Sequence, residues 1–105
     1  MDSTTVGLLV DIRPFPGMLL FHRAFTRPLV DVDGVETPAL WGGVTRIPVS
    51  PGPHDLAVYF RYRFQKKARL AIGHAELTAD EAVPELPVEV RLGPFNHSHF
   101  RVTVG

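Results

Sequence analysis

The chain has 105 residues, 45% of them hydrophobic and 21% charged, which excludes a disordered protein and leaves room for one domain over residues 1–105. Eleven Lys and Arg residues balance eleven Asp and Glu residues, which excludes a global attraction for nucleic acid or anionic membranes. Without Cys there are no disulfides, Cys-based metal sites or thiol nucleophiles. The first residues lack a basic region followed by a long apolar stretch, so we expect a cytoplasmic protein that does not insert into membranes.

The N-terminal third predicts β-strands. Residues 5–13 place apolar side chains at every second position, which is strand periodicity with one apolar face. Residues 18–26 are apolar at most positions, and we expect a second strand that Pro28 ends. The pair Asp33-Gly34 predicts a two-residue hairpin, because both residues tolerate positive φ angles.

Trp41 is followed by two glycines, which interrupt the strand pattern. Gly42 and Gly43 favour a bulge or a sharp bend and leave space for a neighbouring indole ring. We therefore expect the Trp41 side chain to be mostly buried. Residues 44–49 resume as a short strand, and residues 50–53 form a turn rich in Pro and Gly.

The clearest strand covers residues 56–65. Its alternation predicts a core face made of Leu56, Val58, Phe60, Tyr62 and Phe64. The same alternation predicts a solvated face made of Ala57, Tyr59, Arg61, Arg63 and Gln65. Lys66 and Lys67 are expected at the tip of a hairpin whose second strand is residues 68–77, and residues 88–92 and 100–104 are the last two expected strands.

The whole pattern predicts an all-β fold. Ten Pro and nine Gly residues separate about eight or nine short strands, and no segment reads as a crossover helix. We therefore expect antiparallel sheets packed face to face as a β-sandwich, with a closed β-barrel as the alternative.

Several turn and core residues between positions 30 and 64 follow a recognisable order. They are Val30-Asp31-Val32-Asp33-Gly34, Thr37-Pro38, Trp41-Gly42, Ile47-Pro48-Val49-Ser50-Pro51-Gly52, His54, Leu56 and Val58. This order resembles the PEGA-like repeat and small actinobacterial β proteins, in which a V-x-V-D-G hairpin precedes Thr-Pro and then a P-G-x-H turn. The resemblance implies a small β domain of surface or scaffold proteins with no catalytic residues of its own.

Motifs for enzymatic chemistry are absent from the sequence. No Gly-x-Ser-x-Gly elbow, His-Glu-x-x-His motif or Gly-rich phosphate loop occurs, so we expect no enzyme, no cofactor and no small-molecule substrate. His97 and His99 are weak candidates for metal ligands, because residues two apart on a strand share one face. Arg101 shares that face and no third ligand is apparent, so we expect no stoichiometric metal.

Charge is distributed unevenly along the chain. Five of the eleven basic residues fall within nine positions, namely Arg61, Arg63, Lys66, Lys67 and Arg69. An acidic run without Lys or Arg contains Glu76, Asp80, Glu81, Glu85 and Glu89. We expect the acidic run to neutralise the basic hairpin, either within one molecule or across two copies.

Three function hypotheses follow, in order of preference. The first is a non-catalytic structural or protein-interaction module with a protein partner or self-association. The second is a binding module for a polyanion or carbohydrate that uses Trp41 or the hairpin from Tyr59 to Arg69, including Arg61, Arg63 and Lys67. We expect nucleic acid not to be the ligand, because the chain has no excess of basic residues. The third is a small metal-binding protein that uses His97 and His99.

Overall fold

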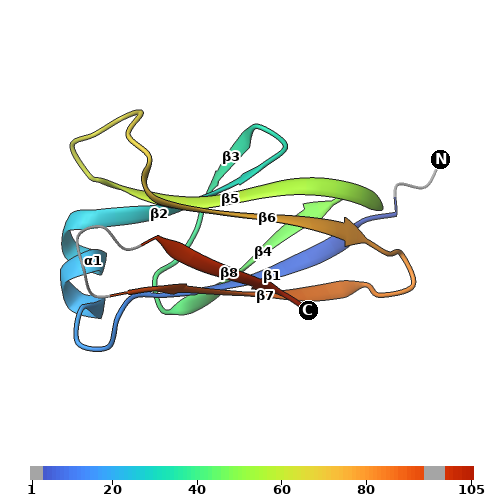
Figure 1. Cartoon of the computed structure of the whole chain (residues 1–105), viewed down its shortest axis with the longest axis horizontal. Coiled ribbons are helices and arrows are strands. Elements are labelled where there is room, and N and C mark those ends of the chain that lie inside the picture. Colours follow the sequence, from blue (N-terminus) through green and yellow to red (C-terminus); the bar gives the residue numbers. More distant parts are fainter. Residues whose placement is uncertain (1–3, 94–98) are drawn as a thin grey trace.

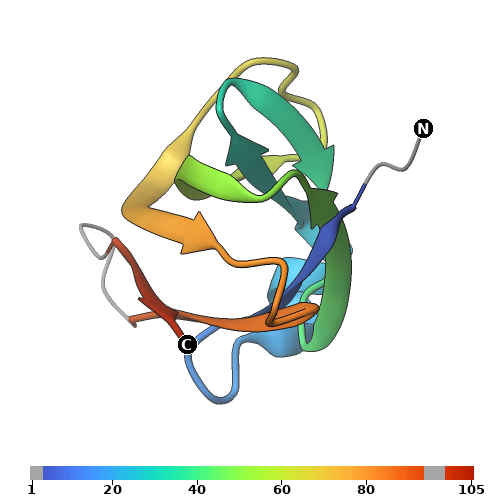
Figure 2. The ribbon, with the colours of Figure 1, turned by 90° about the vertical axis from the view of Figure 1, so that its right-hand side faces the viewer.

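Two four-stranded sheets pack face to face along the 43 Å length of the molecule (Figure 1). The computed structural model describes residues 4–93 and 99–105. The first sheet has the order β4-β1-β7-β8, with strands Gly43–Val49, Val6–Arg13, Glu85–Leu92 and Phe100–Val104. The second has the order β3-β2-β5-β6, with strands Val35–Pro38, Thr26–Val32, Gly52–Tyr62 and Leu70–Ala79. Viewed along the molecule, the two sheets of the described residues stay separate (Figure 2), which confirms the predicted all-β sandwich rather than a closed barrel.

One strand pair departs from the antiparallel arrangement expected from the sequence. β1 pairs in parallel with β7, from Gly7 opposite Glu85 to Arg13 opposite Arg91, whereas the other neighbours are antiparallel. Parallel neighbours need a long connection. Residues 14–84 provide it here, because they build the whole second sheet and β4 before the chain returns beside β1.

The apolar face of β1 lies at the centre of the core. Val6, Leu8, Val10 and Ile12 are each 0% exposed, as their alternation predicts. The same core cluster includes Val30, Leu56 and Val58 from the second sheet, and Val88 and Val90 from β7. Burying side chains of this size contributes about 1.5–3 kcal/mol each to folding, so the interior between the sheets holds the fold together.

Residues 18–26 do not form the expected strand. Leu19–Phe25 is the helix α1, and β2 begins directly after it at Thr26, so that Pro28 lies inside β2 instead of ending a strand. Leu19 and His22, three residues apart, face the core, while Leu20, Phe21 and Phe25 remain exposed. Apolar residues on all sides of this short segment concealed the helical period, because a run of this kind fits either structure. Among the described residues, no helix is long and apolar enough to cross a membrane.

Trp41 closes the α1 end of the sandwich. Its side chain is buried, with 5% of the residue exposed, which confirms the prediction of burial. The indole Nε1 donates a hydrogen bond to Thr26 Oγ1 at 3.0 Å, and the ring centroid lies 4.5 Å from that of His22. The Thr26 hydroxyl donates to the His22 carbonyl oxygen at 2.8 Å. These contacts join α1, β2 and the β3–β4 connection into one packed unit.

The two sheets come closest where β6 passes β8. A Cβ atom added to Gly73 of β6 would lie 2.2 Å from the carbonyl oxygen of Phe100 in β8, so only glycine allows this approach. Beside it, the pairing of β5 with β6 shifts register between Val58 and Phe60, and Ala71 adopts a φ of 58°. Ala71 packs against the core and Ile72 against the cluster on the outer face of the second sheet.

Replacing Gly73 tests this close approach. Gly73→Ala is expected to lower the free energy of unfolding by about 2–3 kcal/mol, because the clash involves backbone that cannot move aside cheaply. Gly43→Ala is the matched control, since its added Cβ would lie 3.6 Å from the nearest atom, Cδ1 of Leu40, at an ordinary φ. Urea unfolding of both variants provides the measurement, and equal stability of the two would contradict the proposed packing of β6 on β8.

Candidate functional site

Tyr59 and Arg61, expected on a solvated face, are buried. Tyr59 is 0% exposed and Arg61 is 5% exposed. They do lie on the outer face of the second sheet, but the β5–β6 loop folds over that face and the edge strand β3 lies beside it. The alternation in β5 predicted which face these side chains share, and it could not show that a loop covers that face. On the expected core side, Phe64 is 83% exposed because it lies beyond the end of β5.

A closed polar cluster occupies this covered face. Glu36 accepts hydrogen bonds from the Tyr59 hydroxyl and, at 2.6 Å, from Arg61 Nη2. Arg61 also donates to the carbonyl oxygens of Ala68 and Lys66 in the loop. Burial, followed by the hydrogen bond to Glu36, raises the pKa of Tyr59 to about 12, and the bond from Tyr59 lowers the pKa of Glu36. Within the cluster, the Glu36 carboxylate neutralises the Arg61 guanidinium, and the hydrogen bonds from Arg61 hold the β5–β6 loop in place.

Arg69 completes the cluster from the outside. Its guanidinium lies 4.7 Å from the centroid of the Tyr59 ring and donates to Asp31 Oδ2 at 3.2 Å. Asp31 Oδ1 in turn accepts the backbone N–H of Gly34 at 2.7 Å in the β2–β3 hairpin. Of the basic residues gathered between positions 61 and 69, Arg61 and Arg69 therefore have structural partners, and Arg61 is also buried.

The different roles of Arg61 and Arg63 can be tested by substitution. Arg61→Ala is expected to cost about 2–3 kcal/mol of stability, because it leaves Glu36 and two loop carbonyls without their donor. Arg63→Ala is expected to cost less than about 1 kcal/mol, because its guanidinium only caps exposed carbonyls near the end of α1. Thermal unfolding of the two variants gives the comparison, and a larger loss for Arg63→Ala would refute the assignment.

Three arginines line a shallow depression between α1 and the β3–β4 connection. Arg23, Arg27 and Arg63 share it with Leu40, which is 60% exposed, and we call this set the arginine groove. Each guanidinium is held by backbone carbonyl oxygens: Arg23 by that of Trp41 at 3.4 Å, Arg27 by that of Gln65 at 3.3 Å, and Arg63 by those of Arg23 and Ala24 at 2.7 and 3.0 Å.

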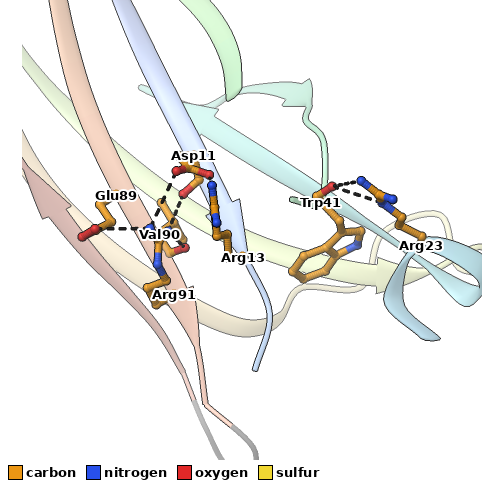
Figure 3. A network of polar contacts seen from close by, with 7 residues as sticks. All are labelled: Asp11, Arg13, Arg23, Trp41, Glu89, Val90 and Arg91. Atoms are coloured by element: carbon orange, nitrogen blue, oxygen red, sulfur yellow. Dashed lines mark hydrogen bonds and ion pairs between the residues drawn. The ribbon is translucent and has the colours of Figure 1, made fainter. Parts of the chain in front are cut away.

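The arginine groove keeps its positive charge. Within residues 4–93 and 99–105, none of its three guanidinium groups forms an ion pair with a carboxylate. Figure 3 shows the contrast, since Arg23 reaches only the backbone of Trp41 whereas Arg91 is bracketed by Asp11 and Glu89. Backbone carbonyls orient the groove arginines without neutralising them, which prepares them for anionic groups of a ligand.

Exposed apolar side chains gather around the same end of the molecule. Ten large apolar side chains of the described residues are exposed, and eight of them lie at the α1 end: Phe15, Met18, Leu20, Phe21, Phe25, Leu40, Val44 and Phe64. A chain of ring contacts, each between 5.2 and 6.0 Å from centroid to centroid, leads from Phe25 through Phe21, His22, Phe60 and Tyr62 to Phe64. We call the arginine groove and these apolar side chains the basic pole. Exposed apolar groups in such numbers are typical of a contact surface.

The opposite end of the second sheet is acidic. Asp55 in β5 lies directly across from Glu76 in β6, and both are exposed on the outer face. Together with Asp33 they line adjoining shallow depressions, one of which also includes Arg69 and His74. Asp80 and Glu81 follow in the β6–β7 turn, and we call these five residues the acidic pole. Like charges directly opposite each other on neighbouring strands are destabilising, so this arrangement suits a cationic partner better than water alone.

His54 bridges two acceptors beside the acidic pole. Its Nδ1 donates to Asp33 Oδ2 at 2.5 Å and its Nε2 donates to the Ser50 carbonyl oxygen at 2.6 Å. Both nitrogens can donate only when the ring is protonated. The bond to Asp33, followed by that to Ser50, raises the pKa of His54 above its ordinary value of 6.5. Burial has the opposite effect on His22 and lowers its pKa.

These shifts predict opposite pH responses. The stability that His54 contributes is present below pH 6.5 and is lost as the pH rises through its folded-state pKa, whereas His22 destabilises the fold as the pH falls below 6.5. Asp33→Asn is expected to lower the pKa of His54 and to leave that of His22 unchanged. An NMR titration of the imidazole Cε1–H signals measures both residues at once, and an unchanged His54 pKa in the variant would contradict the bridge.

The remaining sequence candidates lie elsewhere. Lys67 is exposed in the β5–β6 loop, and Trp41 is too deeply buried to serve as a stacking platform for a sugar. His99 is exposed, while His97 lies outside the described residues, so the metal hypothesis remains a prediction. Within the described part of the chain, no three His, Asp or Glu side chains are grouped so that they could hold a metal ion.

Comparisons with known proteins found no match. No family model matches the chain, and no curated protein or solved structure is significantly similar to it. The PEGA-like resemblance therefore stays a prediction, and function has to be inferred from the surfaces themselves. Sequence reasoning missed Arg23 and Arg27, although the first lies inside the apolar segment 18–26 and the second follows it directly. A helical interpretation of that segment would have placed them at the same end of the fold as Arg63.

Proposed function

We propose that this chain is a non-catalytic protein-interaction module whose basic pole docks onto an acidic protein segment that also carries apolar side chains. The observation that supports this most strongly is the arginine groove, where three guanidiniums held by backbone carbonyls surround exposed Leu40. Charge and apolar surface are present together there, and this combination matches a partner that presents carboxylates beside apolar groups.

Two features favour a protein over a nucleic acid as the partner. The exposed Leu20, Phe25 and Phe64 offer apolar area that a phosphate backbone cannot use, and the chain as a whole has no net positive charge. A polyanion is the second candidate, since Lys66 and Lys67 extend the positive surface along the β5–β6 loop next to Phe64. The two candidates differ in which part of the surface the ligand must touch.

The docking hypothesis is tested with three probes on the isotope-labelled protein. The first is a short peptide of interspersed Glu and Leu residues, the second replaces each Glu with Gln, and the third is a single-stranded oligonucleotide. The Glu peptide is expected to shift amide signals of α1 and of residues 39–43 and 63–65, and to bind about tenfold or more tightly than the Gln peptide, which corresponds to about 1.4 kcal/mol.

Matched variants show whether the groove is responsible. Arg23→Gln combined with Arg63→Gln is expected to abolish the preference for the Glu peptide, whereas Arg46→Gln, on β4, is expected to keep it. Equal binding of the Glu and Gln peptides would overturn the docking hypothesis. Tighter binding of the oligonucleotide than of the Glu peptide would replace it with the polyanion-binding function.

A further inference from the structure

Charge is segregated along the long axis of the molecule. β2 and β6 run away from the α1 end, and β5 runs back toward it (Figure 1). Arg27 and Arg63 lie at the α1 end of β2 and β5, whereas Asp33 follows the far end of β2 beside Asp55 within β5, and Asp80 follows the far end of β6. The acidic run therefore does not neutralise the basic hairpin within one molecule. Only two of its members form ion pairs among the described residues, Glu85 with Arg46 at 3.8 Å and Glu89 with Arg91 at 3.2 Å.

We propose that the acidic partner of the basic pole is the acidic pole of a second copy of this chain, so that copies associate head to tail. This inference rests on the proposed function and names its partner. Asp55 and Glu76 repel each other across neighbouring strands, and the uncompensated guanidiniums of Arg23 and Arg63 supply the charge that relieves this repulsion. A net charge of zero leaves no overall repulsion between copies.

Apolar surface is complementary as well. The two exposed large apolar residues of the described chain that lie away from the α1 end are Val35, beside the Asp33-Gly34 hairpin, and Val83, in the β6–β7 turn. Both lie near the acidic pole. In the proposed head-to-tail contact, Leu20 and Phe25 of one copy are therefore expected to pack near Val35 and Val83 of the next copy, while the arginines contact its carboxylates.

Geometry determines the kind of assembly. The two poles are different surfaces, so the contact is heterologous and leaves one unsatisfied pole at each end of every assembly. Such contacts extend as open chains unless a rotation closes them into a ring. The molecule is 25 × 20 Å across its long axis. The basic pole, at one end of the molecule, is limited to a cross-section of on the order of 500 Å², less than the roughly 800 Å² per partner of a stable complex, so we expect weak, concentration-dependent association.

Sedimentation velocity over micromolar to millimolar concentrations tests the assembly. The wild-type chain is expected to increase in average mass without a plateau at the dimer. The association should be lost between about 0.1 and 1 M NaCl, where the screening length falls from about 10 to 3 Å. A plateau at a dimer, or association that is unaffected by salt, would overturn the head-to-tail contact.

Two half-blocked variants make the test specific. Arg23→Gln with Arg63→Gln removes the basic pole, and Asp55→Asn with Glu76→Gln removes the acidic pole. Each variant alone is expected to stay monomeric. An equimolar mixture is expected to form a one-to-one heterodimer and nothing larger, because the intact acidic pole of the first variant can bind only the intact basic pole of the second. Arg46→Gln with Glu85→Gln removes an ion pair outside both poles, keeps the net charge, and is expected to associate like the wild-type chain.

The outcomes separate this inference from the proposed function. A wild-type chain that stays monomeric at millimolar concentration, but still binds the Glu peptide at the arginine groove, overturns self-association and leaves docking onto an acidic protein in place. A mixture of half-blocked variants without a heterodimer overturns it equally. Far-ultraviolet circular dichroism of each variant establishes that it is folded before sedimentation.

Discussion

The hydroxyl group of Thr26 is the contact on which the α1 end depends. It donates to the His22 carbonyl oxygen at 2.8 Å, so it has no further proton to give and accepts from both Trp41 Nε1 and His22 Nδ1, at 3.0 and 3.1 Å. His22 therefore carries a proton on Nδ1, and the burial that lowers its pKa favours the neutral ring. This node fixes α1 across the end of the sandwich and so fixes which of its side chains face outward.

The surface chemistry of that end follows from the node. Because His22 and Leu19 face the core, Leu20, Phe21 and Phe25 lie on the opposite side of the helix and are exposed to solvent. Its last carbonyls lie beside β5, where Arg63 caps them, and Arg23 reaches back to the Trp41 carbonyl. The arginine groove thus results from the position of α1 and from the arginines that cap its carbonyl oxygens. Its positive charge remains because the guanidinium groups donate to carbonyl oxygens rather than to carboxylates.

Two arginines on the second sheet differ from those of the arginine groove, because carboxylates compensate their charge. Arg61 and Arg69 turn over the outer face, where Glu36, Asp31 and the ring of Tyr59 compensate them. Compensation of this kind stabilises the loop and neutralises both guanidinium groups. Arg61 and Arg63, only two residues apart in the sequence, therefore have different roles, because different chain segments lie above each of them.

The sequence alone predicted the sandwich, because alternation in β1, β5 and β7 and the turn at Asp33-Gly34 depend only on neighbouring residues. The turn expected at residues 50–53 is shorter than predicted, since Gly52 and Pro53 begin β5. It also determined that Trp41 would be buried, since two glycines follow it. Tertiary structure decided the helix at residues 19–25, the parallel pairing of β1 with β7, and the burial of Tyr59 and Arg61. A fully apolar short segment has no readable period, and strand direction and loop cover depend on residues far away in sequence. The separation of charge into two poles has the same origin, because strand pairing places Arg27 and Arg63 at the α1 end of β2 and β5 and brings Asp33, Asp55 and Glu76 together further along the second sheet.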